Sequence, residues 1–416
     1  MIELVMAILI FGLVVSGIAA GMMSTLNLAR QNKNRSIAAN LASQEMDLVR
    51  STTFTDLPLG QTLSTQSVDG VPYTVDRETE WVTQSASSGP CQAPPGSNLA
   101  YLAVAVSVTW PNMAGVKPPL TNTVVNPPVG TYDPLSGHIA VTVHDRGGLP
   151  QDGVTVTIVG STVTDSQTTG VDGCAFFAYE PAGIYTVTLS STGYVNDQNA
   201  AAPSQSATVA AGGIVPLQFQ YDAAATVILT LQGKTGGAVP AAIPIGLWNT
   251  HTLPAGVRIF PGSGNPRTIG GLFPFSDGYE AWAGSCLDAN PEGTNSAGAL
   301  IYAGASRLGI ANITPGGSVS TTLQMAETQV TTQTAGGVLR PGITITATHV
   351  APTLPLVETG CPSGEVYTLG TTNSSGQLLA ALPYGTWAIK AGATAGGNIS
   401  LSPLVGSTVN KTVIVP

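Results

Sequence analysis

The apolar run at the N-terminus constrains the fold of this chain more than any other feature. Residues 4–23 contain a single polar side chain, that of Ser16, and Glu3 is the only charged residue before Arg30. Twenty such residues in a helix measure roughly 30 Å, the thickness of the hydrocarbon core of a bilayer. A helix that is apolar on every face needs apolar surroundings on every side, whether lipid or other helices.

The same helix is predicted to continue to residue 52, because the first proline is Pro58. Beyond Arg30 the pattern becomes amphipathic. One apolar stripe recurs at helical spacing and is formed by Ile37, Ala38, Leu41, Ala42, Leu48 and Val49. Such a stripe needs a globular domain to lie against. Three glycines in the apolar half are either weak points of the helix or places where helices pack closely, namely Gly12, Gly17 and Gly21.

A secretory signal peptide and a plain membrane anchor are the alternatives for the first segment. A signal peptide starts with basic residues, has a shorter apolar region and ends in a small-residue cleavage site. This chain instead starts with Glu3 and runs into an amphipathic helix. An anchor leaves Glu3 at the head of the apolar run without a role, although a carboxylate at a helix N-terminus is favourable in itself.

The remainder of the chain is predicted to be β, which gives an α+β fold that is mostly β overall. Gly (49) and Pro (30) are frequent and only 9% of residues are charged, a composition that favours short strands and turns. The net charge of −9 argues against direct nucleic-acid binding. Composition and alternation predict five segments: a long helix, a β head with a proline-rich linker, and three immunoglobulin-like units, over residues 1–52, 53–136, 137–222, 223–328 and 329–416.

The N-terminal stretch Met1-Ile2-Glu3-Leu4-Val5-Met6-Ala7-Ile8-Leu9 resembles the start of a processed type IV pilin or pseudopilin. Residues 38–51 are similar to the second half of pilin helices, especially those of minor pilins. In that family the glutamate is the fifth mature residue, whereas here it is the third. The resemblance implies that the helix polymerises into a filament core and that the N-terminal amine of the mature chain is methylated, and the shifted glutamate leaves open which residue carries that amine.

A physical reason for Glu3 follows from the resemblance. A carboxylate packed among apolar helices is costly unless it is paired, and the amine of a neighbouring copy is a suitable partner. Such a pair fixes the axial register of the stack. The predicted assembly residues are therefore Met1, Glu3, Gly12, Gly17 and Gly21.

A second resemblance concerns the β units. Residues 168–174 and 181–187 resemble the carboxypeptidase-regulatory-like family, whose members have a transthyretin-like or immunoglobulin-like sandwich fold. Similar segments at 371–376 and 383–389 indicate an internal repeat at a distance of about 200 residues. That module is an accessory domain, so the resemblance carries no catalytic residues.

The residues that carry chemistry are sparse. His138 and His144 flank one predicted strand and are expected at surface or edge positions, whereas His349 is in step with Ile343 and Ile345 and is expected to be packed. No nucleophile elbow, zinc-protease motif or phosphate-binding loop is present in the sequence. We expect no enzyme activity, no cofactor and no metal site.

The four cysteines are far apart and form no CxxC pair, which disfavours a zinc ribbon. An even number in an extracellular chain predicts two disulfides. Sequence alone does not fix the pairing, and we expect Cys286–Cys361 and, on weaker grounds, Cys91–Cys174.

Taken with the resemblance, these features imply a structural subunit of a type IV pilus, used for adhesion, motility or DNA uptake. The expected partners are other copies of the chain in a helical homopolymer, the pilus assembly machinery and the inner membrane before assembly, with surfaces or glycans as further candidates. The expected location is an extracellular filament, and the cytoplasmic membrane before assembly. The alternatives are a minor pilin or secretion pseudopilin that carries a binding module, and a membrane-anchored adhesin.

Overall fold

The computed structural model describes residues 2–83, 89–113, 115–128, 130, 135–254, 256–295, 297–351, 365–404 and 408–416. The chain folds into two compact units. Unit 1 comprises residues 1–142, 152–188 and 204–218, and unit 2 comprises residues 143–151, 189–203 and 219–416. One long helix precedes a chain that is otherwise built of strands, which confirms the predicted α+β fold that is mostly β.

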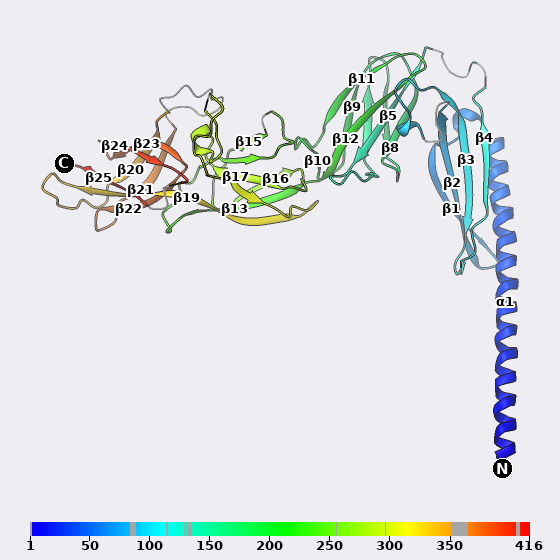
Figure 1. Ribbon diagram of the computed structural model, residues 1–416. Helices are drawn as coiled ribbons and strands as arrows, with labels where there is room; N and C mark the ends of the chain where they lie inside the picture. The colour runs from blue at the N-terminus through cyan, green and yellow to red at the C-terminus, as the bar shows by residue number, and fades with distance from the viewer. Residues whose placement is uncertain are drawn as a thin grey trace. The chain divides into compact units, whose positions relative to one another are not determined.

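The helix α1 spans Ile2–Ser51, close to the predicted 1–52. It lies against an antiparallel sheet with strand order β1-β2-β3-β4, which we call the head sheet (Figure 1). Its strands are β1 (Gly60–Val68), β2 (Val71–Thr83), β3 (Leu99–Thr109) and β4 (Leu120–Val125). Two short 3-10 helices, η1 (Phe54–Asp56) and η2 (Pro90–Gln92), lie in its connections.

Alternation along β2 and β3 turns one face of the head sheet towards the helix. The inward side chains of β3 are Leu102, Val104, Val106 and Val108, each at most 1% exposed. The helix contributes Ala38, Leu41, Ala42, Met46 and Val49 to the same core. Leu48, which was predicted to belong to the stripe, is instead 53% exposed, because the buried face runs through Met46 and Val49.

Residues 137–223 form two sheets, with strand orders β10-β12-β5-β8 and β11-β9-β6-β7. Strands β5, β9 and β12 contribute residues to both units. The strands are β5 (Gly137–His144), β6 (Thr155–Val159), β7 (Thr164–Thr168), β8 (Cys174–Glu180), β9 (Gly183–Ser190), β10 (Tyr194–Asn196), β11 (Ser204–Val209) and β12 (Ile214–Ala223).

The prediction that His138 lies at the surface or at an edge is wrong. Its side chain is buried, its Nδ1 accepts a hydrogen bond from the backbone N–H of Tyr179 at 2.9 Å, and its ring packs edge-to-face on that of Tyr179. Burial lowers the pKa of His138 to about 4 from its usual 6.5. His144 is half-buried.

We expect the stability of unit 1 to fall as the pH drops from about 6.5 to about 4. In this window the unfolded chain binds a proton at His138 and the folded chain does not, which removes about 3 kcal/mol of unfolding free energy. Denaturant unfolding at several pH values measures the loss. In His138→Gln, which retains an acceptor for the Tyr179 N–H, this part of the pH dependence should disappear, and an unchanged profile would contradict the assignment.

Unit 2 contains three further sheets, with strand orders β16-β13-β19-β22, β15-β14-β17-β18 and β21-β20-β23-β24. Strand β25 pairs in parallel with β19. The strands are β13 (Ala225–Gly233), β14 (Ile245–Trp248), β15 (Val257–Phe260), β16 (Arg267–Leu272), β17 (Tyr279–Ala283), β18 (Leu308–Ile310), β19 (Ser318–Gln333), β20 (Thr344–His349), β21 (Val366–Thr371), β22 (Gln377–Leu382), β23 (Gly385–Ala391), β24 (Thr394–Leu401) and β25 (Val409–Ile414).

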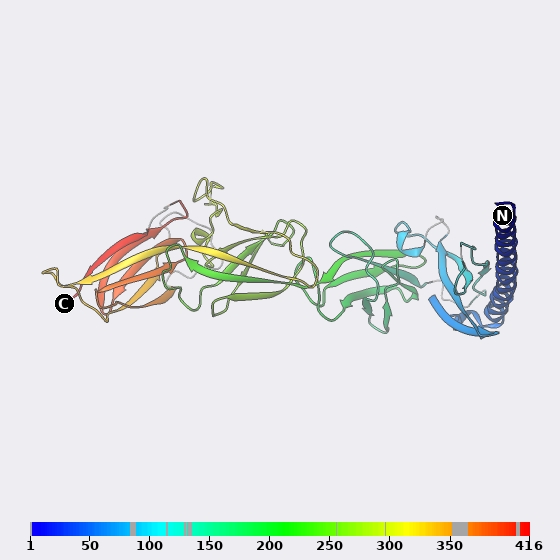
Figure 2. The ribbon, with the colours of Figure 1, turned by 90° about the horizontal axis from the view of Figure 1, so that it is seen from below.

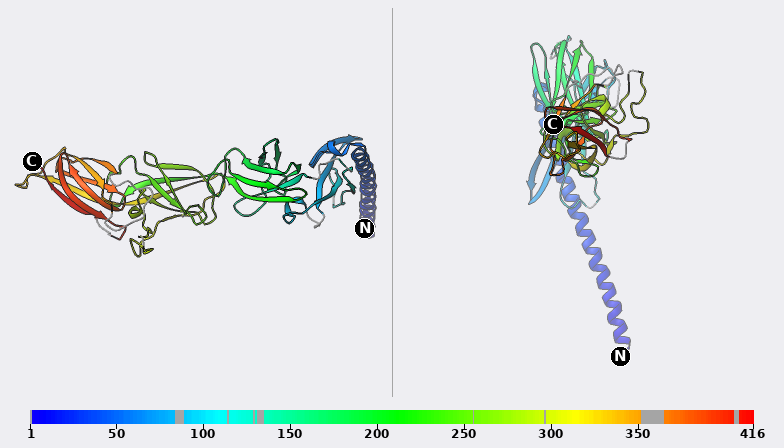
Figure 3. Two further views of the ribbon diagram at one scale, coloured as in Figure 1. Left: turned by 90° about the horizontal axis from the view of Figure 1, so that it is seen from above. Right: turned by 90° about the vertical axis from the view of Figure 1, so that its left-hand side faces the viewer.

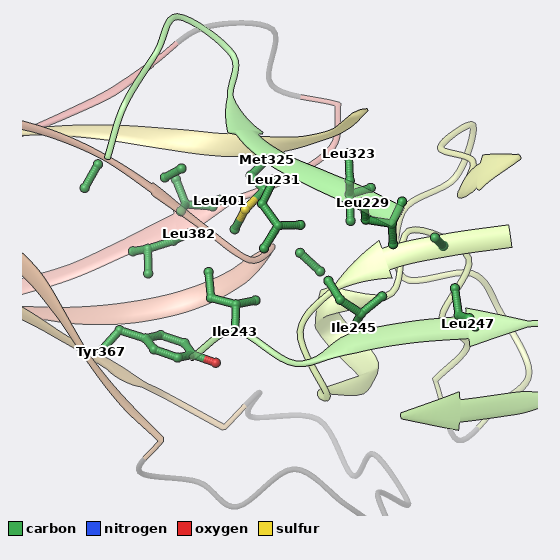
Figure 4. Packing of buried hydrophobic residues seen from close by; sticks show 14 of the residues in the cluster. Leu229, Leu231, Ile243, Ile245, Leu247, Leu323, Met325, Tyr367, Leu382 and Leu401 are labelled. Atoms are coloured by element: carbon green, nitrogen blue, oxygen red, sulfur yellow. The ribbon is translucent and has the colours of Figure 1, made fainter. Parts of the chain in front are cut away.

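One continuous core fills unit 2. Figure 4 shows side chains from β13, β14 and β19, among them Leu231, Ile245 and Met325, converging with Leu382 and Leu401 from the C-terminal strands. Strand β19 is 16 residues long and crosses the predicted boundary at 328/329. Figure 2 shows it as one long yellow strand. The division into five segments stays a prediction.

The connection between β17 and β18 packs on the sheet face opposite this core. It contains the 3-10 helix η3 (Leu287–Ala289) and ends at Arg307. The guanidinium of Arg307 lies 4.8 Å from the ring centre of Trp248 and 5.4 Å from that of Trp282, and forms an ion pair with Glu280 at 3.0 Å. The two cation–π contacts and the ion pair thus anchor the end of this long connection on the sheet.

Candidate functional site: the apolar helix and its contact with the head sheet

Among the side chains that the structure describes, those of the N-terminal half of α1 are exposed and have no contact partner within the chain. Its large apolar side chains are exposed on all sides, including Phe11 at 71% and Met23 at 68%. Figures 1 and 3 show this half of the helix running clear of the head sheet. By length and composition, residues 9–51 form one helix able to cross a membrane, and none of its most apolar window is buried in the chain. Exposed apolar area of this extent requires lipid or a protein partner.

The three predicted assembly glycines lie within this exposed half. A Cβ placed at Gly12, Gly17 or Gly21 meets nothing within 4 Å, so none of them is needed for packing inside the chain. Met1 lies outside the described residues, and the side chain of Glu3 is likewise not described. The assembly roles of these five residues stay predictions.

The C-terminal half of α1 is held on the head sheet by polar contacts as well as by its apolar face. The side chains of Arg77 on β2 and Glu45 on α1 form an ion pair of 2.9 Å between Nη1 and Oε1, and they are only 8% and 15% exposed. The hydroxyl of Tyr73 donates to Oδ1 of Asn34 at 3.1 Å. Sliding the helix along the sheet would separate these two charges and leave each of them buried without a partner, which costs free energy. The ion pair therefore fixes the position of the helix along the sheet.

The helix first contacts the head at the point where its composition changes. Gln31 donates to the backbone oxygen of Asn112 at 3.1 Å, and Lys33 forms a 2.8 Å ion pair with Asp69. Both partners in that pair are more than 60% exposed, so the pair adds little stability. The boundary between the free and the bound half of α1 therefore lies near residue 30.

Sequence reasoning missed the Glu45–Arg77 pair. Arg77 lies at an inward position of β2, between Val75 and Thr79, and reads as a solvent residue unless the alternation of the strand is followed through it. That alternation was the available signal. Glu45, the partner of Arg77, lies 32 residues earlier in the sequence, and only the packing of the helix on the sheet brings the two side chains together.

The structure contains the Cys91–Cys174 disulfide, with a Cα–Cα distance of 5.9 Å. It lies within unit 1 and joins η2 to the start of β8, as predicted. The core of unit 1 also runs across the predicted boundary at residue 136, because Ala140, Phe176 and Ile214 belong to the same cluster as Trp81. Cys361 lies outside the described residues, so Cys286–Cys361 stays a prediction.

Replacing Cys91 and Cys174 by serine should destabilise unit 1 by about 4 kcal/mol, because the bond closes a loop with a sequence separation of 83 residues. Denaturant unfolding of the double variant, compared with the parent, measures the loss. The matched control is Cys286→Ser, which removes the contribution of Cys286 to the effect of reductant. In that background, the loss caused by the two serine substitutions should equal the loss caused by reductant. An unchanged midpoint would contradict this prediction.

A second cluster of potential ligand atoms lies in unit 2. Cys286, Asp288 and His349 are buried, and their donor atoms lie within 4.8 Å of one another. The sulfur of Cys286 is engaged in a disulfide and is therefore no thiolate ligand. His349 packs as predicted, with Nε2 at 3.0 Å from the Asp288 carboxylate and its ring against Trp387. The cluster is accounted for by packing and hydrogen bonding.

Comparisons with known proteins found only solved structures that share little sequence with this chain. No family model matches the chain, and no curated protein matches it. Solved structures similar to it include the Bacillus anthracis TIE protein, at 14% identity and a TM-score of 0.21, covering 91% of this chain and 78% of that one. A minor pilin of Streptococcus agalactiae matches at 12% identity and a TM-score of 0.22, covering 45% of this chain and 95% of that one.

The major pilin subunit of Bacillus cereus matches at 10% identity and a TM-score of 0.20, covering 67% of this chain and 98% of that one. Because these TM-scores are so low, the likeness carries no conclusion about the function of this chain. Its function is therefore argued from its own residues.

Proposed function

We propose that this chain is the structural subunit of a type IV pilus, which polymerises through the apolar half of α1 and carries its β units on the filament surface. The observation that carries the proposal is the helix itself. Its first half is exposed on every side, whereas its second half is fixed to the head sheet by a buried stripe and a buried ion pair. A helix built in this way presents one half to a common core and leaves its own head outside that core.

The exposed glycines support close packing between copies. Gly12, Gly17 and Gly21 have open space at the Cβ position, and helices approach most closely where side chains are smallest. In this proposal the apolar half first lies in the cytoplasmic membrane, where assembly machinery extracts it. It then exchanges lipid for the same segment of other copies.

The proposal is tested by shearing cells, collecting extracellular fibres and imaging them by cryo-electron microscopy. Fibres composed mainly of this chain, with residues 6–28 in their core, are the expected result. Fibres that contain the chain only at low copy or at the tip would identify a minor pilin or pseudopilin. Recovery only as a membrane-embedded monomer would identify an anchored adhesin and would overturn the proposal.

Glu3 is proposed to set the axial register of the filament by pairing with the N-terminal amine of a neighbouring copy. Glu3→Val should therefore leave the β units folded and lower the fibre yield by about tenfold or more, because the pair no longer distinguishes one register from another. Fibre yield by quantitative blotting of the sheared fraction measures the effect. Asp47→Asn is the matched control for loss of one helical carboxylate, because the Asp47 side chain is 76% exposed. Normal yield from Glu3→Val contradicts the pairing.

A further inference from the structure

The head sheet ends in two edge strands, and in the described part of the chain no further strand pairs with the outer edge of either. β1 and β4 are the outer strands of the order β1-β2-β3-β4. Seven of the nine residues of β1 are exposed. Within the described part of the chain, no backbone hydrogen bond joins the free edge of β1 or of β4 to another segment. Each edge therefore presents a row of unpaired N–H and C=O groups.

Neither edge carries the features that normally prevent pairing with another chain. Exposed edges in soluble proteins are usually protected by charged side chains, proline or a β-bulge. β1 (GQTLSTQSV) and β4 (LTNTVV) contain no charged residue and no proline. Their registers with β2 and β3 are continuous, without a bulge.

Within the strands of the head sheet, exposed large aliphatic side chains are confined to β1 and β4. Among the strands of the head sheet, the large apolar residues that are exposed are Leu63 at 62%, Leu120 at 64% and Val124 at 58%. Leu63 lies opposite Asp76, and Val124 lies opposite Ala103. These positions alternate with the inward ones, so all three side chains are on the face away from α1.

The direction of the strands selects the kind of contact. Three successive antiparallel pairings make β1 and β4 antiparallel to each other. A second copy in the same orientation therefore brings its β1 antiparallel to the β4 of the first, with both helices on the same side of the joined sheet. Pairing of β1 with β1 would instead relate two copies by a twofold axis, which closes the assembly.

We propose that β1 of one copy pairs with β4 of a neighbouring copy, so that the head sheet continues from subunit to subunit. This rests on the proposed function, because only a filament of equally oriented copies supplies the partner edge throughout. The contact joins the two unprotected edges by backbone hydrogen bonds. It places Leu63 of one copy on the same face as Leu120 and Val124 of the next, where cross-strand apolar pairs stabilise a sheet.

Cysteine cross-linking in assembled filaments tests the contact. Asn122→Cys on β4 is combined in turn with Leu63→Cys, Ser64→Cys, Thr65→Cys and Gln66→Cys on β1. Leu63 and Thr65 share the outward face with Asn122, whereas Ser64 and Gln66 do not. We expect cross-links with period two, strong at the first pair of positions and weak at the second, that yield a ladder of multimers on a non-reducing gel.

A second test of the edge contact introduces positive charges on both edge strands. The double substitution Leu63→Lys and Val124→Lys should lower the fibre yield by about tenfold, since it places like charges across the contact. Its matched control is Ile184→Lys, at an exposed apolar position of β9 outside the head sheet. Unchanged thermal unfolding of both variants separates loss of contact from misfolding.

The outcomes distinguish the two proposals. Wild-type chain that forms no fibres overturns the proposed function. Normal fibres without a period-two ladder overturn the edge contact and leave the helical core standing. A dimer without higher multimers from Leu63→Cys alone identifies β1–β1 pairing, and it also overturns the edge contact.

Discussion

Val14→Asp is expected to abolish filament formation. Val14 lies in the middle of the apolar half of α1 and is 53% exposed in the isolated chain, so in a filament core every subunit would bury one more carboxylate. An unpaired buried charge costs several kcal/mol, and this cost is repeated in each copy. The measurement is the amount of the chain in sheared fibres relative to the amount in the membrane fraction.

Leu48→Asp is the matched control for that experiment. Leu48 is on the same helix, is also 53% exposed and lies on the solvent side of the half that contacts the head sheet. This variant should assemble at the parental yield. If both variants assemble normally, the apolar half is not the core of a polymer. If both fail, a charge anywhere on the helix is disruptive and the apolar half has no special role.

Arg77→Ala is expected to lower the unfolding free energy of unit 1 by about 3 kcal/mol. The substitution leaves Glu45, which is 15% exposed, without its cation beneath the helix. Denaturant unfolding of the chain in detergent, followed by the fluorescence of the buried Trp81 and Trp110, measures the change. The double variant with Glu45→Ala should recover much of the loss, since no unpaired charge remains.

Lys33→Ala is the control for this pair. Lys33 and Asp69 also join the helix to the head, but both are exposed to water and screened by salt. The variant should unfold at the parental midpoint. If Lys33→Ala lowered the unfolding free energy as much as Arg77→Ala, any ion pair between the helix and the head would be equivalent. Burial of the Glu45–Arg77 pair would then not explain its contribution.

The helix and its two halves were predictable because their signals are local. The apolar run, the absence of proline before Pro58 and the change at Arg30 are all read directly along the chain, and α1 ends at Ser51 as this pattern indicates. The face that binds the sheet was less accessible. Leu41 lies at one margin of the buried face and Val49 lies near its centre. Residues seven apart drift by about 20° on a helix, and this drift places Leu48 just beyond the margin.

Contacts between distant segments account for the other differences. His138 stands at the start of a strand, where exposure is the usual outcome, but the backbone N–H of Tyr179 supplies a partner that makes its burial possible. The proline-rich segment 126–136 was read as a boundary, yet a disulfide and one core connect the residues on its two sides. Strand β19 contains no glycine or proline to end it, which is why a boundary placed within it had no local signal.

The long strand β19 also determines how unit 2 bears tension. Its first half pairs in parallel with β13, at the start of residues 225–416, and its second half pairs in parallel with β25, at the C-terminus. A pull on the two ends of this segment drags β13 and β25 in opposite directions along the same intervening strand. The ladders are then loaded in shear, so that many hydrogen bonds must break together instead of one after another. Forced unfolding is governed by the barrier and not by equilibrium stability. This arrangement therefore gives residues 225–416 resistance to a pull on their two ends.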